Sequence, residues 1–280
     1  MKADPGYFGP NSMMWKVNKE ITVLFGGARA LLMHAAHPLI AAGARQTSFY
    51  QRDPWKRLIR TLSLQNSVTF GTIEEANDSA TRINRLHEVI KGKDEVTGGY
   101  YDALDHEQLL WVHACLQISS IYFYEKTVRK LTDDEKNQYH DENMVSAKLV
   151  LIDIDKTPKT HEELKRWVME KSREKNYLRL TDVAKDVQDI ISGGPVPKHI
   201  KPIWPFISFT AFNTLPDEFK KLYGVKSSKF KSLLLGFNLY LLKFTRPLLP
   251  PFFRLIPPAR WVKQRLKRNP NLKFSDKANI

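Results

Sequence analysis

Residues 109–126, LLWVHACLQISSIYFYEK, form a long apolar run without proline or glycine. Asp105 precedes this run as an N-cap, so the sequence predicts a long apolar helix here. Helical periodicity also dominates the rest of the chain, and the strict alternation of apolar and polar residues that is typical of strands is scarce. We therefore expect an all-α fold in one main domain.

Other helices follow from local signals on both sides of this run. Residues 23–45, VLFGGARALLMHAAHPLIAAGAR, are Ala/Gly-rich helical sequence that should bend or break near Pro38. Asp53-Pro54 resembles an N-cap with a first-turn proline. A helix should then run from about Trp55 to Phe70. The next should run from about Ile73 to Lys91 with Gly92 as its C-cap, and a short hairpin near 94–102 is compatible with the pattern.

Two capping boxes mark helices further along the chain. Thr132 with Glu135, and Thr160 with Glu163, predict helices at about 133–152 and 161–175. Residues 192–205, SGGPVPKHIKPIWP, read as a proline-rich connection. After this connection we expect a short helix from Pro216 to Gly224 and then basic C-terminal helices.

Composition and charge limit the functional classes. The chain has 280 residues with a single cysteine, Cys115, which excludes an internal disulfide and a C-x-x-C-H haem attachment site and fits a reducing cytosol. Residues 219–274 hold 14 of the 44 Lys and Arg residues and no acid, whereas the other 30 basic residues are balanced by 30 acidic ones. This basic segment is also apolar, which is typical of a segment resting on an anionic membrane surface. An ordinary solvated face with a docked helix is the alternative.

His87 is the first candidate for chemistry. Ala76, Ala80, Ile83, His87 and Ile90 recur at helical spacing, so His87 should occupy a core position. A buried imidazole needs a hydrogen-bond partner or a metal ion. The spacing alone does not separate a metal ligand from a core histidine bonded to a carbonyl.

The second candidate is a polar helix face formed by Arg57, Arg60 and Thr61. Their spacing of three and four places all three side chains on one side of a helix. Two arginines beside a threonine suit carboxylates, phosphates or a bound oxygen species. Solvated arginines on a surface helix are the alternative.

Three more histidines lie in largely apolar sequence. His34 and His37 are one helical turn apart, but no carboxylate accompanies them as in H-E-x-x-H, so we interpret this pair as structural. His113 lies in the middle of its helix and could line the same pocket as His87. The sequence lacks a P-loop, a Rossmann glycine motif and a G-x-S-x-G elbow, which disfavours nucleotide-dependent catalysis and serine hydrolysis.

The order of several short motifs resembles a known family. These motifs are H-P at 37–38, D-P-x-x-R-x-x-R-T at 53–61, F-G at 70–71, R-x-x-H within RINRLHEVIKG, and Y-x-A followed by W-V-H. Together they resemble the MpaB and rubber oxygenase catalytic domain, which includes the latex clearing proteins. The resemblance covers roughly residues 19–268, so we expect an extension at 1–18, the catalytic domain at 19–268 and a tail at 269–280.

The resemblance implies a globin-like all-α core around haem b. The proximal iron ligand of that family matches His87, and its R-x-x-K-T motif near the haem matches Arg57, Arg60 and Thr61. Arg60 stands where the family has lysine, which keeps the charge and changes the geometry. The family's acidic residue upstream of this motif has no counterpart, because residues 34–52 contain no Asp or Glu. We therefore do not carry over polyisoprene as the substrate.

The resulting hypothesis is a haem b-dependent oxygenase that uses dioxygen on an apolar, lipid- or isoprenoid-like substrate. His87 would hold the iron, Arg57, Arg60 and Thr61 would be catalytic, and Arg57 and His113 would contact the cofactor. The alternative is a non-catalytic membrane-surface or lipid-binding helical protein acting through residues 228–268. Nucleic-acid binding ranks last because leucines and prolines interrupt the basic segment. The N-terminus lacks a signal pattern and no apolar run is long enough to span a membrane, so we expect a cytoplasmic protein, peripheral on the membrane at most.

Overall fold

The computed structural model describes residues 5–47, 54–194, 196–198, 200–260 and 262, with the backbone alone for residues 54–61. In this part of the chain the elements are, in order, α1 Met13–Asn18, η1 Ile21–Leu24, α2 Phe25–Ala35, α3 Pro38–Thr47, α5 Pro54–Phe70, α6 Ile73–His87, β1 Lys91–Lys93, β2 Tyr100–Asp102, α7 His106–Thr127, α8 Asp133–Leu149, η2 Ile154–Lys156, α9 His161–Lys171, α10 Asp182–Gly193, η3 Lys201–Ile203, α11 Trp204–Asn213, α12 Asp217–Leu222, α13 Lys229–Thr245, η4 Arg246–Leu248 and α14 Pro251–Arg254. The expected all-α fold is confirmed.

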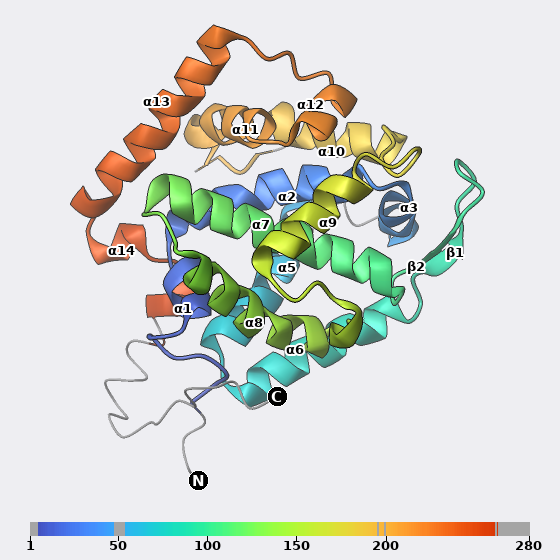
Figure 1. Cartoon of the computed structure of the whole chain (residues 1–280), viewed down its shortest axis with the longest axis horizontal. Helices are drawn as coiled ribbons and strands as arrows, with labels where there is room; N and C mark the ends of the chain where they lie inside the picture. Colours follow the sequence, from blue (N-terminus) through green and yellow to red (C-terminus); the bar gives the residue numbers. More distant parts are fainter. Residues whose placement is uncertain (1–4, 48–53, 195, 199, 261, 263–280) are drawn as a thin grey trace.

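Helix α7 is the central element (Figure 1), and it contacts α2, α8, α9 and α13. Asp105 caps it as predicted, because its side chain accepts the backbone N–H of Gln108 at 3.0 Å. Trp111 is fully buried near the N-terminal end of α7, where its ring packs against Phe219 and its Nε1 donates to the Met33 carbonyl at 3.2 Å. The main hydrophobic core therefore forms where α7 meets α2 and the C-terminal helices.

The predicted break near Pro38 is confirmed. Helix α2 ends at Ala35, α3 begins at Pro38, and the two axes differ by 102°. Proline has no N–H to donate to the preceding turn, so the helix cannot continue through it. Within the described ranges, no single helix has the length and apolar composition to cross a membrane. The segments Ile21–Ala35 and Pro38–Thr47 reach that length and composition only when taken together, as a pair bent by 102°.

Two capping predictions have different outcomes. Thr132 and Glu135 form the expected reciprocal box at the start of α8. Thr160 accepts the Glu163 N–H at 3.2 Å, but the Glu163 carboxylate accepts the Lys159 N–H at 2.9 Å, so this second box is only half formed. Both helices also end earlier than expected, α8 at Leu149 and α9 at Lys171.

Two helices that the sequence reasoning missed, α10 and α11, flank the stretch predicted as a connection. Thr181 caps α10, which buries Val183, Val187 and Ile191 at a spacing of four residues. Helix α11 begins at Trp204, directly after the proline-rich stretch, with a proline in its first turn. Both helices pack on α2 and cover that side of the core.

Candidate functional site

Helix α6 carries the first candidate residue. Thr72 and Glu75 form a capping box at its start, and Ala76 and Ala80 are buried beneath it. The helix ends at His87, so its expected end at Lys91 is wrong. Residues 91–93 instead pair with residues 100–102 in a two-stranded antiparallel sheet, which begins slightly before the expected hairpin.

The reason for the early end lies in the tertiary contacts of the segment that follows. The Ile90 carbonyl accepts the Ala103 N–H at 2.9 Å, and the buried Ile90 side chain lies against Gly43. Gly92 faces Tyr101 so closely that a Cβ there would lie 2.8 Å from the Tyr101 Oη. Gly92 therefore permits close strand pairing rather than capping a helix.

His87 lies half-buried at the last residue of α6. Burial lowers the pKa of its imidazole below the usual value, so the ring is neutral at pH 7. Its Nδ1 is buried and has no hydrogen-bond partner among the described residues. A neutral imidazole with an unused ring nitrogen can donate a lone pair to a metal ion. The chemistry of this residue thus fits an axial iron ligand.

The second candidate face lies on the neighbouring helix. Arg57, Arg60 and Thr61 fall within α5, which packs against α6 and α8. The expected helix bounds, about Trp55 to Phe70, agree with the observed Pro54–Phe70. The side chains of these three residues, and the whole of the predicted N-cap Asp53, lie outside the described residues. Their shared face and their role stay predictions.

His113 is deeply buried in the middle of α7. Burial lowers the pKa of its imidazole to about 4, and the neighbouring His140 adds to that effect. Its Nε2 is buried without a hydrogen-bond partner in the described structure. The residue is therefore neutral and has an unused polar atom, which is compatible with the predicted cofactor contact without testing it.

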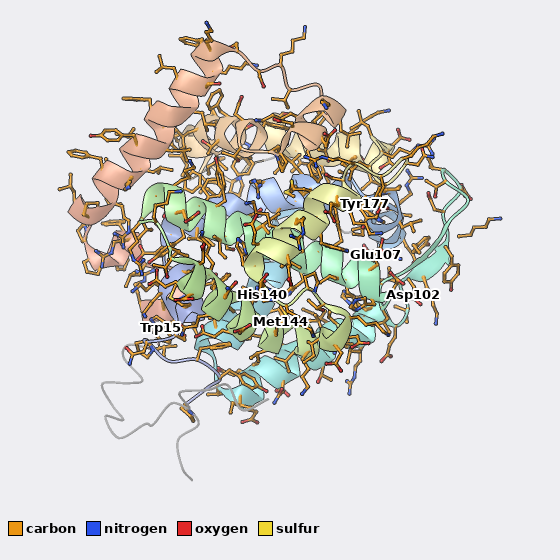
Figure 2. The ribbon with its side chains drawn as sticks, in the orientation of Figure 1. Trp15, Asp102, Glu107, His140, Met144 and Tyr177 are labelled. Carbon is orange, nitrogen blue, oxygen red and sulfur yellow. The ribbon has the colours of Figure 1, made fainter. Side chains whose placement is uncertain are left out.

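A hydrogen-bonded network occupies the adjoining space between α7, α8 and α9. His140 lies on α8, one turn before Met144 (Figure 2), and its Nε2 is 2.9 Å from the Pro158 carbonyl. A carbonyl only accepts, so Nε2 carries the proton and the bare Nδ1 accepts from the Gln117 amide at 2.9 Å. The same amide lies 3.4 Å from His161 Nδ1, and Asn143 donates to the Gln117 Oε1 at 3.2 Å. This network uses the ring nitrogens of His140 and leaves His113 outside it.

Sequence reasoning did not find four buried polar atoms on α5, α6 and α8. They lack a hydrogen-bond partner among the described residues: Thr69 Oγ1, Asn84 Oδ1, Asn143 Oδ1 and Ser146 Oγ. Buried polar atoms are normally paired with protein or water, so each of these four atoms has hydrogen-bonding capacity left for a water or a ligand. Asn84 is one turn before His87, and its amide donates to the Leu149 carbonyl at 2.9 Å, which ties α6 to the end of α8.

This donor set fits a haem better than a metal ion held by protein alone. Among the described residues no group of three or more His, Cys, Asp or Glu side chains could hold a metal ion. Haem supplies four nitrogen ligands from its own macrocycle, so one neutral imidazole from the protein is sufficient. His87 and His113 each have a buried ring nitrogen without a partner among the described residues, and the predicted iron ligand is His87.

His34 and His37 have partners of their own. His34 Nε2 lies 3.0 Å from the Val112 carbonyl, and His37 Nδ1 accepts the Ile40 N–H at 3.4 Å. The His37 ring also packs edge-on against Tyr177 at 4.7 Å between centroids. These contacts agree with the structural role predicted for the pair.

Comparison with known proteins adds one match. The family model described as "ER-bound oxygenase mpaB/B'/Rubber oxygenase, catalytic domain" matches residues 15–246. No curated protein and no solved structure matches the chain. The expected domain boundaries at residues 18 and 268 stay predictions. Because the match spans most of the sequence, the chain belongs to the mpaB and rubber oxygenase catalytic domain family and is an oxygenase domain.

Proposed function

We propose that this oxygenase domain binds haem b and that His87 is the protein's ligand to the iron. The observation that supports the proposal best is the buried, unpartnered Nδ1 of a neutral imidazole at the end of α6. When bound, haem would supply an iron centre able to activate dioxygen. The protein would fix the orientation of the His87 ring and exclude water from the interior between α5 and α8.

The remaining site residues have distinct proposed roles. Arg57, Arg60 and Thr61, on the helix packed against α6, would donate hydrogen bonds toward a propionate or toward developing negative charge on reacting oxygen. His113 would contact the cofactor from α7. The name of the family's rubber oxygenases denotes an apolar polymer as substrate. By analogy we propose a small apolar substrate, of lipid or isoprenoid type, for this chain.

An absorption spectrum of the purified protein after haem supplementation tests the ligand assignment. We expect a Soret band with one haem per chain, and we expect His87→Ala to lose it. Loss of a residue that only hydrogen-bonds a metal ligand costs about 10–100-fold in metal affinity, so loss of the ligand itself should cost more than about 100-fold. His34→Gln is the matched control, because His34 is also a half-buried helical histidine but has a carbonyl partner. An unchanged Soret band in His87→Ala would refute the assignment.

The proposed role of Arg57 can be tested by azide binding, without the substrate. Arg57→Met should keep the haem stoichiometry but bind azide at least about tenfold more weakly, because a charge-assisted hydrogen bond to an anion is lost. Equal azide affinity in the variant and the parent would refute the proposed role of Arg57.

A further inference from the structure

Large apolar side chains lie exposed along the C-terminal helices. Six of them belong to α13 and are between 41% and 74% exposed: Phe230, Leu233, Phe237, Tyr240, Leu241 and Phe244. Four more continue through η4 and α14: Leu248, Leu249, Phe252 and Phe253. We call these ten side chains the apolar ridge. An exposed apolar surface of this extent marks an interaction site on a folded protein.

The ridge lies on one side of a helix whose other side contacts the rest of the fold. Its members on α13 recur every three or four residues, so they share one face. Asn238 and Leu239 are buried on the opposite face, and α13 contacts α7 and α11. Figure 1 shows α13 along the outer edge of the molecule. With 17 residues at about 1.5 Å each, α13 is about 25 Å long.

Contacts with the N-terminal segment fix the far end of the ridge. Arg246 forms two hydrogen bonds of 2.7 and 2.8 Å with the carboxylate of Glu20, whose side chain is 1% exposed. The Ile256 N–H donates to the Lys19 carbonyl at 3.0 Å. The ridge is therefore presented by a rigid part of the fold rather than by a loose tail.

The sequence segment that carries the ridge has charged residues of one sign. Between residues 219 and 274 the sequence has 14 Lys or Arg residues and no Asp or Glu. Lys229 and Lys243 are exposed residues of α13 itself. The Arg260 guanidinium lies 4.1 Å from the centre of the Phe252 ring, so charge and apolar surface are adjacent at the far end as well.

We propose that the apolar ridge docks this protein onto an anionic lipid bilayer, with Phe, Leu and Tyr side chains entering the interface and the flanking lysines contacting headgroups. Apolar area combined with basic charge is what binds a helix in the plane of such a surface. A second copy of the chain is a poorer occupant, because a two-fold contact would bring the same lysines of both copies together. This proposal does not depend on haem binding.

Vesicle binding by the full chain is the direct test. We expect the protein to sediment with vesicles of phosphatidylcholine and phosphatidylserine, and to remain in the supernatant with phosphatidylcholine alone. Replacing Phe237 and Phe244 by Gln should abolish sedimentation without changing the circular dichroism melt, because both side chains are already exposed. Equal binding to both kinds of vesicle, or binding that survives the double substitution, would overturn the proposal.

A single introduced thiol reports which surface enters the lipid. The native Cys115 is fully buried and burial raises the pKa of its thiol, so a new surface cysteine is labelled selectively. Tyr240→Cys on the ridge and Tyr100→Cys on β2 are matched, because the two tyrosines are 63% and 61% exposed. An environment-sensitive dye should brighten on anionic vesicles at position 240 and not at position 100. Brightening at position 100 alone would place the contact elsewhere.

Charge variants test the electrostatic part. Lys229→Gln and Lys243→Gln should each weaken vesicle binding about fivefold, which corresponds to about 1 kcal/mol per charge near an anionic surface. Lys175→Gln, an exposed lysine between α9 and α10, should leave binding unchanged. Light scattering tests the alternative that a second copy of the chain, rather than a bilayer, covers the ridge. A dimer in solution that the Phe237 and Phe244 substitutions dissociate, together with no vesicle binding, would assign the ridge to self-association instead. His87→Ala should bind vesicles normally, which separates this proposal from the haem assignment.

Discussion

Mild acid should destabilise this protein through buried histidines that lie outside the candidate site. His37 and His161 are 6% and 5% exposed. Burial is the main cause that lowers the pKa of each imidazole from 6.5 to about 4. For His161 the nearby His140 lowers the pKa further, whereas for His37 the carboxylates of Glu107 and Asp105 oppose part of the effect. Both rings are therefore neutral in the folded protein at pH 5, where the unfolded chain protonates them.

The sign and size of the effect follow from proton linkage. Between pH 6.5 and pH 4 the unfolded state binds more protons than the folded state, so the free energy of unfolding falls as the pH falls. A pKa difference of about 2.5 units at about 1.4 kcal/mol per unit gives at most about 3.5 kcal/mol per histidine, of which about 3 kcal/mol is reached at pH 4. The two residues together should remove about 6 kcal/mol by pH 4. That is a large share of a typical total stability of about 5–15 kcal/mol.

Urea unfolding followed by circular dichroism, at several pH values from 7.5 to 4.5, measures this effect. His161→Gln and His37→Gln should each reduce the slope of unfolding free energy against pH by up to about 1.4 kcal/mol per unit, whatever they do to stability at pH 7. Glu135 does not interfere, because its hydrogen bond with Arg129 lowers the pKa of its carboxyl to about 2 and its contribution disappears only below this window. A slope that neither substitution changes would refute the reasoning.

Three further predictions concern packing and reactivity. Arg246→Met should cost about 3–5 kcal/mol in unfolding free energy by urea titration, because it leaves a buried carboxylate unpaired, whereas Lys165→Met in an exposed pair should cost less than about 1 kcal/mol. Gly26→Ala should destabilise the fold, because its Cβ would lie 3.1 Å from a backbone oxygen of α7. Gly27→Ala, with open space around the new Cβ, should stabilise the fold by up to about 1 kcal/mol. Equal melting temperatures of the two variants would contradict the packing around Gly26. Cys115 should react with a thiol reagent only in denaturant, since burial raises the pKa of its thiol, and rapid reaction in the folded protein would show access that the structure lacks.

Helices with strong local signals could be predicted from the sequence. Asp105 and the pair Thr132 and Glu135 cap their helices through bonds that span three residues, so nothing beyond the local sequence is needed to find them. Helix α11 has apolar residues on every side and follows a proline-rich stretch, so it carries no periodic signal. Helix α10, in contrast, has a local helical signal that the sequence prediction did not include: its Thr181 cap and its apolar residues every four positions.

In the candidate site, too, the sequence predicts what depends on local spacing and not what depends on tertiary packing. The spacing of its helix predicts a core position for His87, and the structure shows the residue half-buried at the end of that helix. Haem is implied only by the family resemblance. The unpartnered oxygen atoms Asn84 Oδ1, Asn143 Oδ1 and Ser146 Oγ could not be predicted, because the loss of solvent around a polar atom depends on which helix packs over it. The early end of α6 depends likewise on the Ile90 to Ala103 hydrogen bond with the following segment.

The clamp between Arg246 and Glu20 has a consequence for the order in which the chain can fold during synthesis. The two residues are 226 positions apart, and the Lys19 carbonyl likewise waits for the Ile256 N–H. A ribosome exposes the N-terminal helices well before it has polymerised the residues that complete their surroundings. Residues 19 and 20 thus acquire their native partners only when nearly the whole domain has emerged, and a nascent chain stalled before residue 246 must keep the Glu20 carboxylate in water.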